Sequence, residues 1–251
     1  MNIGCITDCG KVRRENQDRC LVLERSFGSE PAVLCVVADG MGGTGDGGLA
    51  SDYVVRRLQR WWEQELPGLL ERQPVYAYVS RSLDELLTGC SREILRQSRQ
   101  LQVSTGTTCS LFFACRKQAL IKHIGDSRIY LKRDGEWMQL TRDHTWEQQE
   151  ISAGRDPKED VDYARKKGAL VNAMGAADTC SIDTQMLQLA EGDCYLLCSD
   201  GFYRYISLSD GMCVMTGAAQ EILERMADVI RTTPAADNFT AILAINNEPI
   251  F

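Results

Sequence analysis

The sequence predicts an α+β fold in which antiparallel sheets carry helices on their outer faces. Two observations predict it. Strand-like segments follow one another along most of the chain instead of alternating with helices, and a pair of helical patterns interrupts them near residues 49–94. The 251 residues show no internal repeat and no low-complexity linker, so we expect one domain that spans residues 1–251.

The N-terminal part of the chain reads as strands that lead into a glycine-rich segment. Residues 3–7 are short and apolar, and residues 20–23 follow a polar loop. Residues 32–38 form a continuous apolar run, which is typical of a buried strand. Residues 39–48 are so rich in glycine that they predict a loop.

Two helices are predicted next. The first begins near Leu49, repeats apolar residues at helical spacing and ends at Pro67-Gly68. The second carries one apolar stripe, made of Val79, Leu83, Leu86, Cys90 and Ile94. Trp61 and Trp62 are adjacent on the first helix, so we expect one to lie in the core and the other to be partly exposed. The alternative is an exposed patch for a partner.

From residue 106 onward the apolar period is again that of strands. The next predicted strands cover residues 107–115, 119–124, 128–132 and 137–140. Residues 152–168 are polar, mixed in charge and without a period, so we interpret them as an exposed flap of the same domain. The remaining predicted elements are strands at 182–188, 194–199 and 239–246 and a helix at 220–231.

Composition excludes several classes of function. The formal net charge is −7 and no block of Lys or Arg is present, so nucleic acid is not an expected partner. No apolar run reaches the length of a membrane span, and the N-terminus lacks the pattern of a secretion signal. Eleven cysteines without a C-x-x-C pair, with only two histidines far apart, disfavour zinc and predict reduced, buried thiols. We therefore expect a cytoplasmic protein, monomeric and away from membranes.

Aspartates at the ends of apolar strands are the most informative feature of the chain: Asp18, Asp39, Asp126, Asp200 and Asp237. One such aspartate is ordinarily part of a turn. Several together indicate a site, because a carboxylate at the rim of a core must be solvated, paired or bound to metal. Carboxylates with a backbone carbonyl suit Mg²⁺ or Mn²⁺. Two such ions about 3.5–4 Å apart can share a bridging water and present hydroxide to phosphorus.

These aspartates belong to motifs that occur together in a known family. The motifs are Arg-x-x-Asn-Gln-Asp (13–18), Ala-Asp-Gly-Met-Gly-Gly (38–43), Gly-Thr-Thr (106–108), Gly-Asp-Ser-Arg (125–128), Asp-His-Thr (143–145), Leu-Cys-Ser-Asp-Gly (197–201) and Asp-Asn-x-Thr (237–240). Each motif alone is weak. In this order and spacing, from residue 1 to about residue 246, the chain resembles the bacterial PP2C-type phosphatases, the PPM family.

The resemblance implies a four-layer fold, with two antiparallel sheets face to face and helices on both outer sides. It also implies a centre of two divalent metal ions. In that centre Asp39 bridges both ions, and Gly40 offers its backbone carbonyl to one of them. Asp200 and Asp237 complete the shell of the first ion.

Three further residues receive roles from the same resemblance. Asp18 matches an acidic outer-shell or water-mediated ligand. Asp126 matches the residue that, with Asp200, holds a third and weaker metal ion in bacterial members. Arg13 is expected to bind the substrate phosphate, since a guanidinium can grip it through two hydrogen bonds. The alternative for Arg13 is a surface ion pair with Glu15 or another neighbouring acid.

The activity implied by the resemblance is hydrolysis of phosphoserine and phosphothreonine in proteins by a metal-bridged hydroxide, with Mn²⁺ or Mg²⁺ as cofactor. The expected partners are phosphorylated Ser/Thr proteins, including a Ser/Thr kinase or its substrates, whose action the enzyme would counteract. Two alternatives stay open. One is a degenerate member that only binds phosphoproteins, and the other is a hydrolase of small phosphate esters on the same fold.

The chain also departs from the family pattern. Met41 and Thr44 stand where many members have a histidine, and Gly47-Gly48 replaces a Gly-Glu pair. The first departure removes the expected general acid. We place His123 in a strand interior and His144 in the turn at 143–145, so a metal-bound water becomes the expected proton donor.

Overall fold

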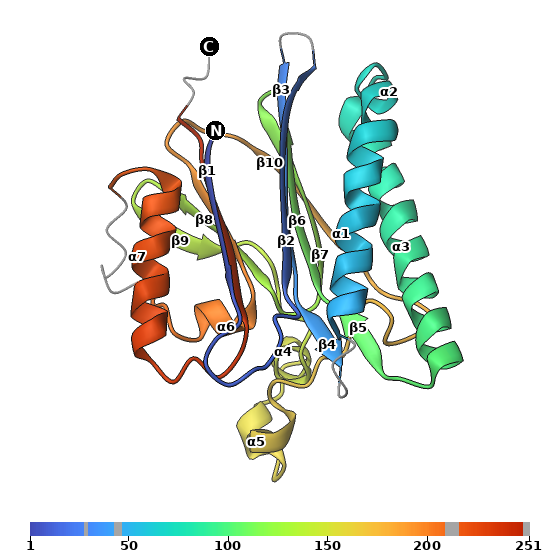
Figure 1. The fold of residues 1–251 in the computed structure, drawn as a ribbon, viewed down its shortest axis with the longest axis vertical. Coiled ribbons are helices and arrows are strands. Elements are labelled where there is room, and N and C mark those ends of the chain that lie inside the picture. Colours follow the sequence, from blue (N-terminus) through green and yellow to red (C-terminus); the bar gives the residue numbers. More distant parts are fainter. Residues whose placement is uncertain (28–29, 43–46, 209–215, 248–251) are drawn as a thin grey trace.

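The computed structural model describes residues 1–27, 30–42, 47–208 and 216–247. Two five-stranded antiparallel sheets lie face to face, with helices α1 (Gly47–Gln64) and α3 (Val75–Leu101) outside one sheet and α7 (Ala219–Thr232) outside the other (Figure 1). The predicted α+β fold of two antiparallel sheets flanked by helices is confirmed. No helix in the described ranges is long and apolar enough to cross a membrane.

The strand orders place the N- and C-terminal strands side by side. One sheet has the order β1 (Asn2–Asp8), β12 (Phe239–Ile245), β11 (Cys194–Cys198), β8 (Arg128–Arg133) and β9 (Glu136–Gln139). The other has the order β10 (Asp183–Gln188), β7 (Gln118–Ile124), β6 (Cys109–Cys115), β3 (Glu30–Ala38) and β2 (Arg19–Phe27). The two sheets thus bring residues from both ends of the chain to one edge of the sandwich.

The continuous apolar run of β3 is buried on both of its faces. Leu34 and Val36 pack in the cluster under α1 and α3, whereas Val33, Cys35 and Val37 pack between the two sheets. A strand that is covered by helices on one side and by a sheet on the other has no polar face. This burial explains why the sequence shows no alternation there.

Both tryptophans of α1 are buried, so the expectation that one would be partly exposed is wrong. Trp61 is 1% exposed and donates its indole N–H to Ser82 Oγ of α3 at 2.8 Å. Trp62 is 4% exposed, and its ring packs edge-on against Phe27 at 6.0 Å. Adjacent residues on a helix point about 100° apart, and here sheet and neighbouring helix cover both directions.

The glycine-rich segment is not wholly a loop. Residues 40–42 form β4 (Gly40–Gly42), which pairs with β5 (Thr105–Thr107) in a two-stranded sheet. Helix α1 then begins at Gly47 instead of Leu49, and α2 (Leu66–Leu70) carries Pro67 in its first turn. Residues 43–46 of the segment, with Thr44, lie outside the described residues. Long-range pairing to β5 overrides the local preference of glycine for irregular structure.

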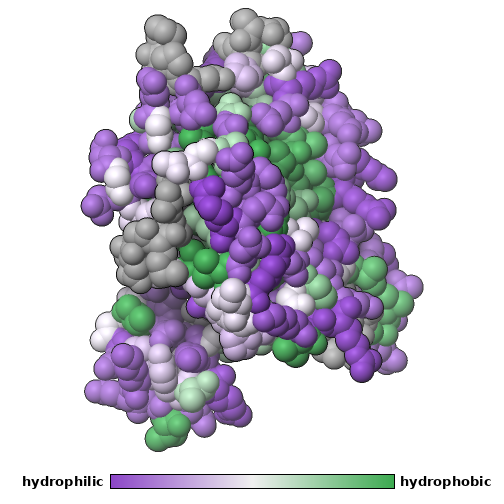
Figure 2. Space-filling model, turned by 60° about the vertical axis from the view of Figure 1, so that its left-hand side comes forward, coloured by the Kyte–Doolittle hydropathy of each residue, from purple (hydrophilic) through white to green (hydrophobic). Residues whose placement is uncertain are grey.

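The flap contains two short helical elements, and its side chains are largely exposed. Helix α4 (Trp146–Ser152) precedes it and begins at Thr145, whose hydroxyl accepts a hydrogen bond from the Gln148 backbone N–H. The flap itself holds η1 (Pro157–Glu159) and α5 (Tyr163–Lys166). It projects beyond the end of the sandwich, and its surface is mainly hydrophilic (Figures 1 and 2).

The described cysteines are all free thiols, and Cys213 lies outside the described residues. Most of them are buried: Cys35, Cys90, Cys109, Cys115, Cys194 and Cys198. Burial raises the pKa of Cys90 to about 11 and raises that of Cys35 further. These side chains therefore serve as small apolar residues of the core, as the sequence predicts.

Candidate metal centre

Four of the five strand-end aspartates line one cavity of about 260 Å³ at the end of the sandwich. Its lining includes Asp39, which follows β3, and Asp126, which lies between β7 and β8. It also includes Asp200, the first residue of α6 (Asp200–Tyr203), and Asp237, just before β12. Both sheets therefore contribute acids to the same space.

Asp39 lies in the middle of this group. Its backbone N–H donates to Thr108 Oγ1 at 2.9 Å, and its carbonyl accepts from the Thr108 N–H at 2.9 Å. Burial raises the pKa of Asp39 well above its usual range, and the charges of Asp18, Asp200, Asp126 and Asp237 raise it further. A carboxylate held rigidly among other carboxylates is a strong site for a cation.

Asp18 lies behind the cavity instead of in its wall. It is 2% exposed, and its Oδ2 accepts a hydrogen bond from Ser199 Oγ at 2.7 Å. Burial raises its pKa to about 6, although the hydrogen bonds from Ser199 and Thr240 oppose that shift. From this position Asp18 can act on the cavity only through water or through its neighbours, and its outer-shell role stays a prediction.

Asp126 is held at the cavity by a tight turn. It is 6% exposed, and the preceding Gly125 has a φ of +107°, which a residue with a side chain rarely adopts. A Cβ at Gly125 would also lie 2.5 Å from Thr108 Cγ2. Burial, together with the charge of Asp200, raises the pKa of Asp126 to about 7.

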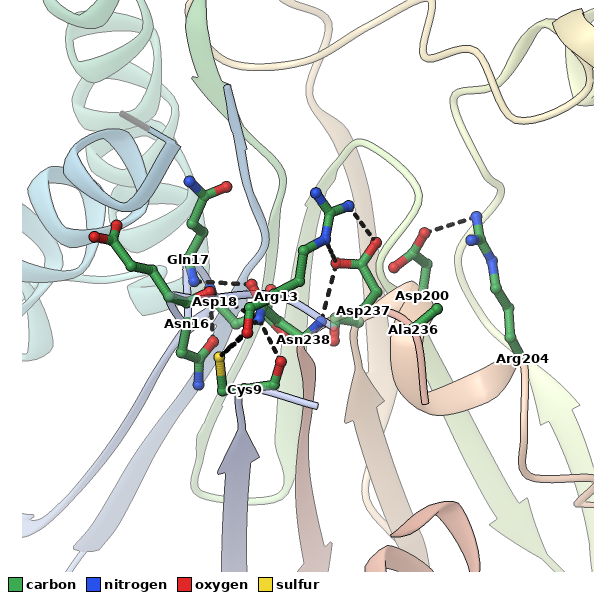
Figure 3. A network of polar contacts seen from close by, with 12 residues as sticks. Cys9, Arg13, Asn16, Gln17, Asp18, Asp200, Arg204, Ala236, Asp237 and Asn238 are labelled. Atoms are coloured by element: carbon green, nitrogen blue, oxygen red, sulfur yellow. Dashed lines mark hydrogen bonds and ion pairs between the residues drawn. The ribbon is translucent and has the colours of Figure 1, made fainter. Parts of the chain in front are cut away.

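Arg13 pairs with a cavity acid and not with Glu15. Its Nε and Nη2 atoms each donate to an oxygen of Asp237 at 2.8 Å, in the forked geometry shown in Figure 3. The hydrogen bonds from Arg13 to Asp237 raise the pKa of the guanidinium. Because its side chain is 56% exposed at the mouth of the cavity, Arg13 can face both the acids and an incoming anion.

Two residues at this site were missed by the sequence reasoning. Asn238 is 5% exposed and its amide donates to the carbonyls of Cys9 and Glu15, which fastens the loop that carries Arg13. Arg204 donates to Asp200, with Nη2 and Oδ2 2.7 Å apart. The Asp-Asn motif could have indicated Asn238, whereas nothing in the local sequence marks Arg204.

The chemistry of these donors fits a hard divalent cation. Among the residues that the structure describes, no three Asp, Glu, His or Cys side chains are already arranged around a single ion position. Carboxylates and the nearby Gly40 backbone nevertheless supply oxygen ligands. Burial, together with the charges of neighbouring acids, raises the pKa of Asp39 and of Asp126 and so disfavours their ionised forms. A bound cation would stabilise the ionised forms of these carboxylates.

Comparison with known proteins decides the family. The family model described as protein phosphatase 2C matches residues 9–244. The chain belongs to the protein phosphatase 2C family. This result confirms the resemblance carried by the seven motifs.

Relatives of this phosphatase 2C chain agree in length and fold. The serine/threonine phosphatase Stp of Listeria innocua is 30% identical over 247 residues, which is 96% of this chain and 94% of the relative. A crystal structure of a bacterial serine phosphatase variant is 25% identical with a TM-score of 0.85, covering 99% of this chain and 98% of that one. The catalytic domain of the phosphatase PstP, solved with two manganese ions, is 27% identical with a TM-score of 0.74, covering 96% of each chain.

Proposed function

We propose that this chain is a metal-dependent protein serine/threonine phosphatase that hydrolyses phosphoserine and phosphothreonine in proteins. The observation that carries the proposal is the convergence of the motif aspartates on one cavity with Arg13 at its mouth. A module that only binds phosphoproteins has no use for such a costly cluster of buried acids. The two manganese ions of PstP support the same chemistry.

In this proposal Asp39, Gly40, Asp200 and Asp237 hold two ions of Mn²⁺ or Mg²⁺, and Asp18 orients the group from behind. When bound, the ions would neutralise the acids and lower the pKa of water. The family resemblance also implies a third and weaker ion, held by Asp126 with Asp200. These roles follow from the family resemblance, and the placement of Asp39, Gly40, Asp200 and Asp237 around one cavity supports them.

Arg13 would bind the phosphate of the substrate. It is paired with Asp237 in the structure. A cation on Asp237 would compete for that carboxylate and release the guanidinium toward the cavity mouth. A phosphate dianion offers the same forked pair of acceptor oxygens as the carboxylate, so the exchange needs little rearrangement.

The biological setting follows from the chemistry of the substrate. Phosphorylated proteins would be the partners, and the enzyme would counteract a protein Ser/Thr kinase by removing its product. The naming of relatives as serine/threonine phosphatases supports this setting. The expected cytoplasmic location and monomeric state remain predictions.

A comparison of substrate classes tests the proposal. The protein, loaded with Mn²⁺, should hydrolyse a phosphothreonine peptide with a higher kcat/KM than the alkyl phosphate esters of small metabolites, such as sugar phosphates. A preference for the small esters would favour the alternative of a metabolite phosphatase. Binding of the peptide without turnover would favour the non-catalytic module.

Replacing Arg13 by alanine should lower kcat/KM on the peptide by roughly 10–100-fold, because hydrogen bonds to charged groups contribute about 1.5–3 kcal/mol. Much of the loss should appear in KM if the contact is as strong in the ground state as in the transition state. Arg14→Ala, at the exposed neighbouring position, is the matched control. Unchanged kinetics for Arg13→Ala would show that it is only a surface ion pair.

Shortening or swapping the flap at residues 152–168 should change rates on phosphoproteins more than on a small aryl phosphate. Gly168 and Leu170, at and just beyond its C-terminal end, line the cavity, while most of the flap is exposed around it. A protein substrate would touch that surface and an aryl phosphate would not. Equal effects on both substrates would contradict a role in substrate choice.

The missing general acid should show in the choice of leaving group. Among the described residues no histidine lines the cavity: Ser110 and the Arg142 carbonyl hold His123, and burial lowers its pKa to about 4. Met41 cannot donate a proton. An aryl leaving group hardly needs protonation, whereas a threonine alkoxide does. We therefore expect a stronger preference for aryl phosphates over phosphothreonine peptides than in relatives that carry the histidine.

Two variants check this expectation. Thr44→His should narrow the gap between aryl phosphate and peptide. His123→Ala, if folded, should keep aryl phosphate turnover within about tenfold of the wild type, below the roughly 10²–10⁴-fold of a positioned acid. Selective collapse of peptide turnover in a folded variant of His123 or His144 would show that one of them is the acid.

A further inference from the structure

Arg204 places a second guanidinium against the acids of the cavity. Its Nη2 lies 2.7 Å from Asp200 Oδ2, and it approaches Asp200 from the side away from Arg13 (Figure 3). Asp200 is 15% exposed, whereas the Arg204 side chain is 53% exposed. The two residues are four positions apart in the sequence, since Asp200 begins α6 and Arg204 directly follows its last residue. No motif of the sequence includes Arg204.

The packing of α6 keeps Arg204 in this position. Phe202 is fully buried, and the Arg128 guanidinium stacks on the Tyr203 ring at 3.8 Å from its centroid. Arg128 in turn donates hydrogen bonds from Nε and Nη2 to the carboxylate of Asp143. Helix α6 cannot turn and carry the backbone of Arg204 away from the cavity without breaking the contacts of Phe202 and Tyr203. The guanidinium can therefore swing only about its own side-chain bonds.

Arg204 does not line the cavity itself, but it lies directly beside residues that line one side of it. A Cβ at Gly168 would lie 4.0 Å from Arg204 Nη2, and Gly168 lines the cavity together with Asp126 and Asp200. Arg13 occupies the other side, on Asp237. Each half of the acidic group thus has one arginine of its own.

We propose that Arg204 is a built-in cation on the Asp126–Asp200 side of the cavity, which weakens the binding of a divalent ion there. The inference rests on the proposed metal-dependent function. Two divalent ions and two guanidiniums together carry one positive charge more than the negative charge of the five carboxylates, counting Asp18. A further ion would enter a site without uncompensated negative charge and would repel the guanidinium. The chain then works with two ions, and its third position is filled by protein.

Counting bound ions tests the role of Arg204 without measuring activity. Metal-free protein is titrated with Mn²⁺ by calorimetry, and free Mn²⁺ is followed by electron paramagnetic resonance. The wild type should bind two ions. Arg204→Ala should bind a third, or bind its weakest ion at least tenfold more tightly. Arg204→Lys, which keeps the positive charge, should behave as the wild type.

Two further variants separate the local charge from general effects. Arg56→Ala removes a pair of the same spacing, Arg56 with Asp52 at 2.7 Å on α1, and should leave Mn²⁺ binding unchanged. Arg204→Ala combined with Asp126→Asn should lose the ion that Arg204→Ala gained. The double variant therefore locates the gained ion beside Asp126.

The outcomes separate this inference from the proposed function. Equal numbers of ions and equal affinities in the wild type and Arg204→Ala would overturn the role of Arg204 and leave the metal centre intact. Three tightly bound ions in the wild type would also overturn it. No Mn²⁺ binding by either protein would overturn the proposed function itself and the inference with it. If Arg204→Ala does not fold, Arg204→Gln offers the same loss of charge with more of the side chain.

Discussion

Asp39→Asn should lower kcat/KM on a phosphothreonine peptide by more than about 100-fold, because even outer-shell substitutions cost roughly 10–100-fold in metal affinity or activity. After burial, the charges of the other acids raise the pKa of Asp39, so Asp39 lies close to all of them. It is therefore the residue best placed to share a cation with several of them. Asparagine keeps the shape and removes the charge. The expected loss is therefore one of metal binding and not of packing.

The same experiment includes its controls. EDTA should abolish turnover by the wild type, and added Mn²⁺ should restore it. Asp134→Asn should have no effect, since Asp134 lies in a hairpin turn at a φ of +53°, which asparagine also tolerates. Full turnover in EDTA, or an Asp39→Asn variant as active as Asp134→Asn, would contradict a metal centre at this cavity.

Gly201→Ala should abolish most of the activity while the protein still folds, with a loss of about 1–3 kcal/mol in the free energy of unfolding. A Cβ at Gly201 would lie 2.0 Å from the Asn238 carbonyl oxygen and 3.5 Å from Asp237 Cβ. The obstacle is backbone, so α6 and the start of β12 must separate. That separation would move Asp200 away from Asp237, the two acids assigned to one ion.

The matched control for Gly201→Ala is Gly89→Ala. A Cβ at Gly89 meets nothing within 4 Å, and Gly89 lies inside α3, where alanine is favoured by roughly 0.5–1 kcal/mol. We expect unchanged activity and a slightly raised melting temperature for that variant. An active Gly201→Ala protein of normal stability would show that the close approach of α6 and β12 does not set the site.

Several features of the fold could be predicted because they depend on residues close together in the chain. The apolar run of β3 and the apolar stripe of α3 each lie within one segment of the chain, and each pattern predicts its element without knowledge of the rest of the fold. The structure has both elements. The two wrong expectations have a different cause. Whether Trp62 is covered depends on Phe27 of another strand, and whether Gly40 extends into β4 depends on Thr107.

The sequence by itself determined the family resemblance, which implied the sandwich fold, and the identity of the aspartates at the strand ends, since motifs and apolar period can be read along the chain. Only the tertiary structure decided which of those acids line the cavity, and that Arg13 pairs with Asp237 across 224 positions. It also decided the position of Arg204. The role proposed for that residue depends on its ion pair with Asp200, which lines the same cavity as Asp126. The physical reason is that electrostatic interactions and packing depend on the distances between side chains in the folded protein. The antiparallel sheets set these distances, because they bring together segments that are far apart in the sequence.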